Sequence, residues 1–235
     1  MHRTYFWRWV GGSCLALLIV AIPFLHYRQT YWYGKRLRAV TPGKVYRSGQ
    51  MTADGLRAAI ARFGIRTVIN LQEEAPDPEM TENYFGGGCS RESDVCAAMG
   101  VRFVFLDLDM VPRAKVAEQR PSAIDRFLKV LDDQDNYPVL IHCRAGLHRT
   151  GVMTAVYRME YEGWPTDRAL RELKGNGFGD NAATAANDYI MQYVLAFKPG
   201  LRPQGSGQPA PRPAALEGAA PDAFLTSRPH PDAQP

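Results

Sequence analysis

The residues best suited to chemistry lie together in residues 142–151, which run His-Cys-Arg-Ala-Gly-Leu-His-Arg-Thr-Gly. An apolar segment typical of a buried strand ends at Cys143, and a helix is expected to begin near Thr150. A tight loop between a strand and a helix N-terminus turns backbone N–H groups toward an anion, and the helix dipole adds positive potential. The stretch therefore predicts a phosphate-binding loop formed by Arg144, Ala145, Gly146, Leu147, His148 and Arg149.

Cys143 is the candidate nucleophile of this loop. Positive potential favours the thiolate form of a cysteine, and a thiolate can attack the phosphorus of a bound phosphate group. Arg149 supplies a planar guanidinium that matches two phosphate oxygens at once, while Gly146 allows the chain to turn tightly beside the ligand. The hydroxyl of Thr150 could hydrogen-bond the sulfur and make it a better leaving group in a second step. We predict that Cys143 and Arg149 are catalytic and that Thr150 supports them.

The pattern His-Cys-x5-Arg-Thr-Gly resembles the signature loop of the cysteine-dependent protein tyrosine and dual-specificity phosphatases. Residues 45–50 (Val-Tyr-Arg-Ser-Gly-Gln) and 67–71 are similar to the opening of bacterial dual-specificity-like phosphatases. Residues 136–143 and 146–151 resemble the plant and fungal atypical group, some members of which act on inositol pyrophosphates. The start of the loop, residues 143–146, also resembles the phosphoinositide 3-phosphatases. The resemblance extends over most of residues 40–195.

The resemblance implies a two-step mechanism through a phosphocysteine, with an aspartic acid from another loop protonating the leaving oxygen. Two aspartates are available, Asp107 and Asp109. Both point to the same face of a strand, so alternation does not separate them. The spacing of Asp109 from Cys143, and its position three residues before Pro112, match the phosphoinositide phosphatase pattern and favour Asp109. The implied mechanism needs no cofactor or metal, and the sequence contains no Cys-x2-Cys or His-x3-His pair.

Several other side chains could act at the site or be structural: His142, Arg144, His148 and Arg47. We expect His142 to orient the loop and tune the thiolate, although it could simply be packed. Arg144 and His148 either contact the substrate or remain solvated. Arg47 either acts near the loop or forms a structural salt bridge. Two further cysteines, Cys89 and Cys96, are free thiols or, outside the cytosol, a disulfide.

Strand-like and helix-like segments alternate along the body of the chain, which predicts an α/β fold with a central, mostly parallel sheet flanked by helices. The expected strands cover residues 44–47, 67–71, 101–108 and 139–142. The expected helices cover residues 52–63, 90–99, 121–131, 150–162, 166–174 and 182–197, with Thr52, Ser90 and Thr166 as N-caps. Residues 72–89, rich in Pro, Glu and Gly, are expected to form a long surface loop.

The N-terminal segment has the composition of a membrane span. Residues 9–27 contain no Lys, Arg, Asp or Glu, and aromatic residues flank the apolar run on both sides. Its length just suffices to cross a hydrocarbon layer of ~30 Å as a helix. We predict a single-pass membrane anchor through residues 10–27 in preference to a cleaved signal peptide, because no small-x-small cleavage site follows the run. A small excess of positive charge after the span favours a cytoplasmic catalytic domain.

The charge distribution divides the chain. Residues 1–53 hold eight basic and no acidic residues, whereas the rest has a net charge of −4, so a nucleic-acid partner is not expected. Residues 198–235 carry nine of the 17 prolines and predict a disordered tail. The expected organisation is an anchor (1–33), a linker (34–42), a catalytic domain (43–197) and the tail (198–235).

Together these observations predict a membrane-anchored phosphomonoesterase. The leading hypothesis is a protein tyrosine or dual-specificity phosphatase, and the alternative is an inositol polyphosphate or phosphoinositide phosphatase. The partner is accordingly a phosphorylated protein or a phosphorylated inositol or lipid. A hypothesis of another class is a non-catalytic phosphate-binding module at the membrane. A rhodanese-type sulfur transferase also uses a loop cysteine, but Arg149-Thr150-Gly151 fits phosphate better.

Overall fold

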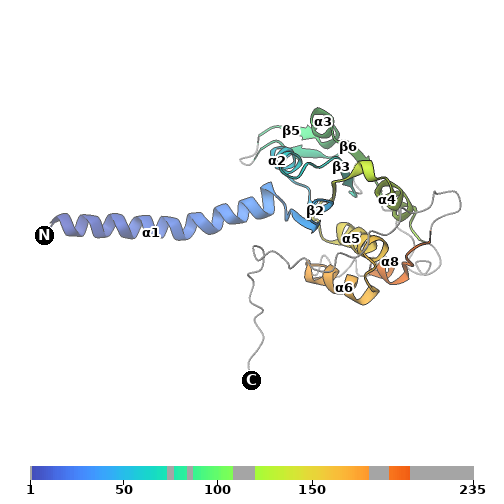
Figure 1. The fold of residues 1–235 in the computed structure, drawn as a ribbon. Helices are drawn as coiled ribbons and strands as arrows, with labels where there is room; N and C mark the ends of the chain where they lie inside the picture. Colours follow the sequence, from blue (N-terminus) through green and yellow to red (C-terminus); the bar gives the residue numbers. More distant parts are fainter. Residues whose placement is uncertain (1, 73–76, 84–86, 108–119, 180–190, 202–235) are drawn as a thin grey trace, which may run out of the picture.

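The computed structural model describes residues 2–72, 77–83, 87–107, 120–179 and 191–201. A long helix, α1 (His2–Arg28), projects from a body in which helices cover a sheet (Figure 1). A short π-helix, η1 (Gln29–Tyr33), continues α1 and leads into the body. Asp109, residues 182–190 of the expected last helix, and most of the expected tail lie outside the described residues.

The main sheet has the strand order β1-β2-β7-β3-β6. Its strands are β1 (Arg38–Thr41), β2 (Val45–Gly49), β3 (Thr67–Asn70), β6 (Arg102–Phe105) and β7 (Val139–Cys143). β1 is antiparallel to β2, and the remaining pairs are parallel. The sheet confirms the predicted α/β class. It also shows that residues 34–42, assigned above to a linker, contain an edge strand.

Strand β7 lies between β2 and β3, and all of its residues are buried. Val139 and Ile141 face one hydrophobic core, whereas Leu140 faces a second core on the other side of the sheet. Burial on both faces accounts for the continuous apolar run, as is usual for the inner strands of parallel sheets. The run ends at Cys143, so the carboxyl end of the central strand is where the chain can present a reactive side chain.

Helices pack on both faces of the sheet. The first core brings together the sheet with α4 (Ser122–Asp132), α5 (His148–Tyr161), α6 (Thr166–Gly175) and α8 (Met191–Ala196). The second core joins it to α2 (Ala53–Phe63) and α3 (Glu92–Ala98). The start of α2 confirms the sequence prediction, because Thr52 Oγ1 accepts a hydrogen bond of 3.1 Å from Gly55 N.

The segment expected to be a surface loop differs from the prediction. It contains β4 (Glu79–Thr81), which pairs antiparallel with β5 (Cys89–Arg91). Ser90 is therefore a strand residue whose hydroxyl donates to the Glu82 carboxylate, and not the cap of α3. The prediction that Ser90 caps α3 was wrong because its hydroxyl bonds to Glu82, the residue that follows β4. At the start of α6 the N-cap position is Pro165, and Thr166 is the first helical residue.

The N-terminal helix has the length and composition of a membrane span over Tyr5–Tyr33, and none of its apolar window is buried in the body. A signal sequence can satisfy the same two criteria. Among the described residues, one helix is long and apolar enough to cross a membrane.

Candidate active site

Cys143 lies at the carboxyl end of β7, at the edge where β2 and β3 also end. The strand register places Gly49 beside Cys143 and Asn70 beside His142. The loop of residues 144–147 then leads into α5, which begins at His148. Cys143 is a free thiol with only 5% of its surface exposed. The predicted strand, loop and helix succession is thus present, with the cysteine at its base.

Three consecutive carbonyl groups of the loop are hydrogen-bonded to groups outside it. The carbonyl of Arg144 accepts from Gln50 N at 3.1 Å, that of Ala145 from Arg36 Nη1 at 3.0 Å, and that of Gly146 from Arg47 Nη2 at 2.9 Å. In a trans peptide the N–H points opposite to the carbonyl of the preceding residue. The N–H groups that follow these carbonyls are therefore turned to the inner side of the loop, where they can bind an anion together with the N-terminus of α5.

Gly146 lets the loop lie directly on β2. Its φ of +72° belongs to the left-handed region, and a Cβ there would lie 2.5 Å from Ser48 C, Ser48 O and Gly49 N. Gly49 is similarly enclosed, since a Cβ would lie 2.5 Å from Lys35 Cγ and 2.9 Å from Arg144 O. The loop thus has a fixed support that leaves no space for a side chain.

Arg47 contacts the backbone of the loop from strand β2. The side chain is buried, with 2% exposed, and its guanidinium donates to the Gly146 carbonyl. Burial, with a contribution from the nearby Arg38, lowers the pKa of Arg47 to about 10, so that it still carries its charge at neutral pH. Of the two roles left open above, the structure gives Arg47 the one beside the loop.

His142 contacts a buried carboxylate that sequence reasoning missed. Glu92 Oε1 lies 2.8 Å from His142 Nε2, although the ring N–H does not align as in a regular hydrogen bond. Glu92 Oε2 accepts a 2.7 Å hydrogen bond from Asn70 Nδ2, and Asn70 Oδ1 accepts one of 2.7 Å from Gln72 N. This network ties α3 to the ends of β3 and β7. No spacing rule pairs Glu92 with His142, because the two residues are far apart in the sequence and are brought together only by the folding of the chain.

The remaining predicted loop residues are distributed around this base. Arg149 is half-buried, and its Nη1 donates to the Leu71 carbonyl at 3.5 Å. Arg144 and Ala145 are exposed, and Leu147 is half-buried. The His148 ring packs edge-on against Phe178 with 5.1 Å between the ring centroids. The Arg149 side chain therefore reaches the segment that directly follows β3.

Thr150 lies at the start of α5 and is completely buried. Its hydroxyl has no hydrogen-bond partner among the described residues. The predicted bond from this hydroxyl to the sulfur of Cys143 stays a prediction.

Of the two candidate acids, the structure describes Asp107 and not Asp109. Asp107 is exposed, and its backbone carbonyl accepts a 3.0 Å hydrogen bond from Arg126 Nη2 on α4. Asp109 lies outside the described residues. The assignment of the acid to Asp109 therefore rests on the sequence pattern.

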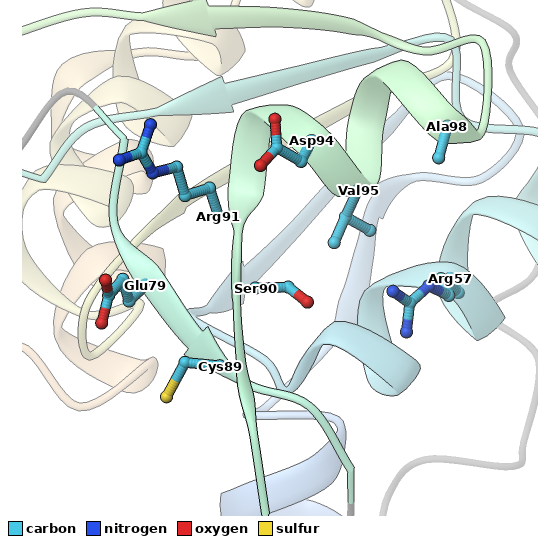
Figure 2. Close-up of a pocket in the computed structure, with 8 residues that line it drawn as sticks. All are labelled: Arg57, Glu79, Cys89, Ser90, Arg91, Asp94, Val95 and Ala98. Carbon is cyan, nitrogen blue, oxygen red and sulfur yellow. The ribbon is translucent and has the colours of Figure 1, made fainter.

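A cavity of about 490 Å³ lies beside α3, and its lining includes none of the loop residues 144–149. Its lining is drawn in Figure 2: Arg57, Glu79, Cys89, Ser90, Arg91, Asp94, Val95 and Ala98. Cys89 is an exposed free thiol in this lining, whereas Cys96 on α3 is completely buried and also free. The structure thus leaves these two cysteines as thiols.

A family model described as "DSP-PTPase phosphatase fused to NAD+ Kinase" matches residues 34–188. The dual specificity protein phosphatase TpbA of Pseudomonas aeruginosa is 49% identical over 43 residues, which is 18% of this chain and 20% of that protein. The inositol diphosphatase DSP1 of Oryza sativa subsp. japonica is 33% identical over 116 residues, 48% of this chain and 45% of that protein. The chain thus spans less than half the length of these curated relatives.

A solved structure with the same fold is the core catalytic domain of the PP-IP phosphatase SIW14 from S. cerevisiae, in complex with citrate. It superimposes with a TM-score of 0.52 and 16% identity, and the match covers 71% of this chain and 87% of that one. At this identity the similarity shows the fold, including the mixed sheet flanked by helices.

The packing of Gly146 leads to a first prediction. Gly146→Ala should weaken the binding of tungstate, a phosphate-like oxyanion, by roughly tenfold or more, because the displaced loop loses at least one charge-assisted hydrogen bond. Isothermal titration calorimetry measures this. Gly163→Ala is a matched control, because Gly163 also has a positive φ of +67° but a Cβ there would meet nothing within 4 Å. Equal affinity in the two variants would show that the loop can move without loss.

The two cysteines lead to a second prediction. Burial, followed by the charges of Glu92 and Asp77, raises the pKa of Cys96 to about 12, so this thiol is protonated and enclosed at pH 8. Iodoacetamide should therefore alkylate Cys89 in the folded protein and leave Cys96 unmodified until denaturant is added. Peptide mass spectrometry measures both sites, and Cys89→Ser controls for the assignment. Rapid alkylation of Cys96 without denaturant would contradict the buried position.

Proposed function

The chain belongs to the DSP-PTPase family of cysteine-dependent phosphatases, and on this basis we propose that it hydrolyses phosphate monoesters through a phosphocysteine on Cys143. The observation that carries the proposal is that three consecutive carbonyls in the loop after the buried Cys143 are hydrogen-bonded outside it, so that the N–H groups following them face the inner side of the loop. That arrangement binds a tetrahedral anion and supplies a nucleophile in one place.

In the first proposed step, the thiolate of Cys143 attacks phosphorus, the S–P bond forms and the P–O bond to the leaving group breaks. The loop N–H groups and Arg149 stabilise the charge on the equatorial oxygens. Asp109 donates a proton to the leaving oxygen. In the second step, water attacks phosphorus and gives a proton to the same carboxylate, and the S–P bond breaks to release phosphate. The Thr150 hydroxyl would assist by hydrogen-bonding the departing sulfur.

Other residues would position this machinery. Arg47 fixes the Gly146 peptide, and the Glu92 carboxylate constrains the His142 side chain next to Cys143. Because the side chains of Arg47, Glu92 and His142 are at most 2% exposed, none of them can contact a substrate without a rearrangement. We propose that they are positioning residues.

The substrate class has two candidates. Among the relatives, TpbA is named a dual specificity protein phosphatase, whereas DSP1 is named an inositol diphosphatase. A phosphoprotein is therefore one candidate, and a phosphorylated inositol or lipid is the other, supported here by the exposed Arg144 at the loop. A non-catalytic phosphate-binding module remains the hypothesis of another class, which the activity assay below distinguishes.

We further propose that α1 anchors the protein as a single-pass membrane helix through residues 10–27. The helix is long and apolar enough, and its apolar window makes no buried contacts with the body. The proposed catalytic domain is cytoplasmic, because basic residues are slightly more numerous after the span than before it. A reducing compartment also suits a reactive thiol.

The proposed function predicts that Cys143→Ser abolishes phosphate release and leaves phosphate-ligand binding in place. The assay uses the full chain in detergent micelles with four substrates: a phosphotyrosine peptide, a phosphothreonine peptide, a phosphoinositide and an inositol polyphosphate. Trapping the wild type with acid should yield a phosphocysteine on Cys143. Binding of the ligands without turnover of any of them would instead support the binding module.

The same assay distinguishes the two aspartates. Asp109→Asn should lower kcat by roughly 10²–10⁴-fold, the usual contribution of a general acid. It should also abolish the basic limb of the pH profile, because activity on that limb falls as the general acid loses its proton. Asp107→Asn should remain close to the wild type. The opposite result would assign the acid to Asp107.

A further inference from the structure

The segment that follows the N-terminal helix lies directly against the phosphate loop. Arg36 Nη1 donates to the Ala145 carbonyl at 3.0 Å, and the Lys35 carbonyl accepts a 2.7 Å hydrogen bond from Gly49 N. Lys35 Cγ occupies the space that a Cβ on Gly49 would need. Residues 35 and 36 therefore form part of the wall around the loop, even though they lie only two and three residues after η1.

The end of the helix is itself fixed to the catalytic body. The Tyr33 hydroxyl donates to the Asp54 carbonyl at 3.2 Å, at the start of α2. A Cβ on Gly55 would lie only 2.2 Å from Tyr33 O, so the two backbones are in close contact. The Arg36 guanidinium also lies over the Tyr31 ring, with 4.9 Å to the centroid. These contacts hold the loop at a fixed distance from the helix end.

Positive side chains gather at this wall. Burial, followed by the charges of Arg36 and Arg144, lowers the pKa of Lys35, so the three cations lie close enough to repel one another. Within the described residues, no carboxylate pairs with Lys35 or Arg36. The charges of Lys35 and Arg36 are unfavourable so close together, and their proximity becomes favourable when an anionic ligand lies beside them.

The geometry also sets the height of the loop above a bilayer. From Tyr27, the end of the proposed span, to Tyr33 the helix rises by about 9 Å, and Lys35 is two residues further. The polar headgroup region on each side of the hydrocarbon layer is ~5–8 Å thick. The wall of the loop would therefore lie at the outer edge of the headgroups of the membrane that holds α1.

We propose that the substrate is a phosphate monoester on the headgroup of a lipid in that same membrane, and that Lys35 and Arg36 bind this headgroup at the rim of the loop. The inference rests on the proposed function, including the membrane anchor. A lipid headgroup of that membrane would already lie at the level of Lys35 and Arg36. A folded phosphoprotein would instead have to enter between the catalytic body and a bilayer whose surface lies within a few residues of them.

The first test uses the full chain reconstituted in phosphatidylcholine vesicles doped with a phosphatidylinositol monophosphate or with phosphatidic acid. About twelve Gly and Ser residues inserted between Arg28 and Gln29 would lift the body by a span of ~20 Å. The insertion separates η1 from α1 but keeps the contact of Tyr33 with the start of α2. The insertion should lower lipid turnover by roughly tenfold or more. Turnover of the deacylated, water-soluble headgroups should be unchanged.

The second test removes one cation. Lys35→Ala should raise KM for the lipid by roughly tenfold and leave kcat nearly unchanged, because the lost contact binds the headgroup and does not touch the reacting bonds. Lys44→Ala is the matched control, because Lys44 is an exposed lysine at the opposite end of β2. An aryl phosphate measured with each variant reports whether the phosphate loop remains intact.

Each result decides between the proposals. Lipid turnover that falls with the insertion and with Lys35→Ala, while aryl phosphate turnover persists, supports the lipid substrate. If the full chain hydrolyses aryl phosphate and phosphopeptides but neither lipid, or if the insertion leaves lipid turnover unchanged, the lipid inference is overturned and the proposed phosphatase function stands. Failure to hydrolyse even the aryl phosphate would overturn the proposed function itself.

Discussion

The structure depends on the orientation of three peptide groups in the loop that follows β7. Their carbonyls are held outward by Gln50 N, Arg36 and Arg47, three donors from the segment between the helix end and the start of α2. A carbonyl fixed on one side of a planar peptide fixes the N–H on the other side. The N–H groups of the loop are therefore oriented before a ligand binds, and the proposed reaction would need no reorganisation of them.

This constraint explains why the surroundings of the loop are so closely packed. Gly146 and Gly49 allow two backbones to touch, and Arg47 occupies the buried space beneath them. On the other side of β7, the contact of Glu92 with His142 and Asn70 joins α3 to the ends of two central strands. Both sets of contacts restrain the peptide on either side of Cys143. Cys143 is thus held by elements from three parts of the chain.

The same contacts couple the proposed membrane anchor to the catalytic centre. Lys35 and Arg36 stand both at the end of the apolar helix and at the wall of the loop. A tether of unrestrained residues would leave the height and tilt of the site undefined, whereas the Tyr33 contact with α2 joins the end of the helix to the body. Localisation and substrate choice would then be properties of one short segment, and the strand β1 that follows it is part of the sheet.

By itself the sequence determined the α/β class, the ends of α2 and the whole strand, loop and helix around Cys143, because local hydrophobic pattern, caps and loop spacing are encoded over a few neighbouring residues. It misassigned residues 79–91 and the linker around β1, because short strands depend on partners that only pairing reveals. Glu92, and the roles of Arg47, Lys35 and Arg36 at the loop, were decided by the tertiary structure. Those side chains act on the loop from distant positions in the chain, and only the packing of the sheet brings the positions together.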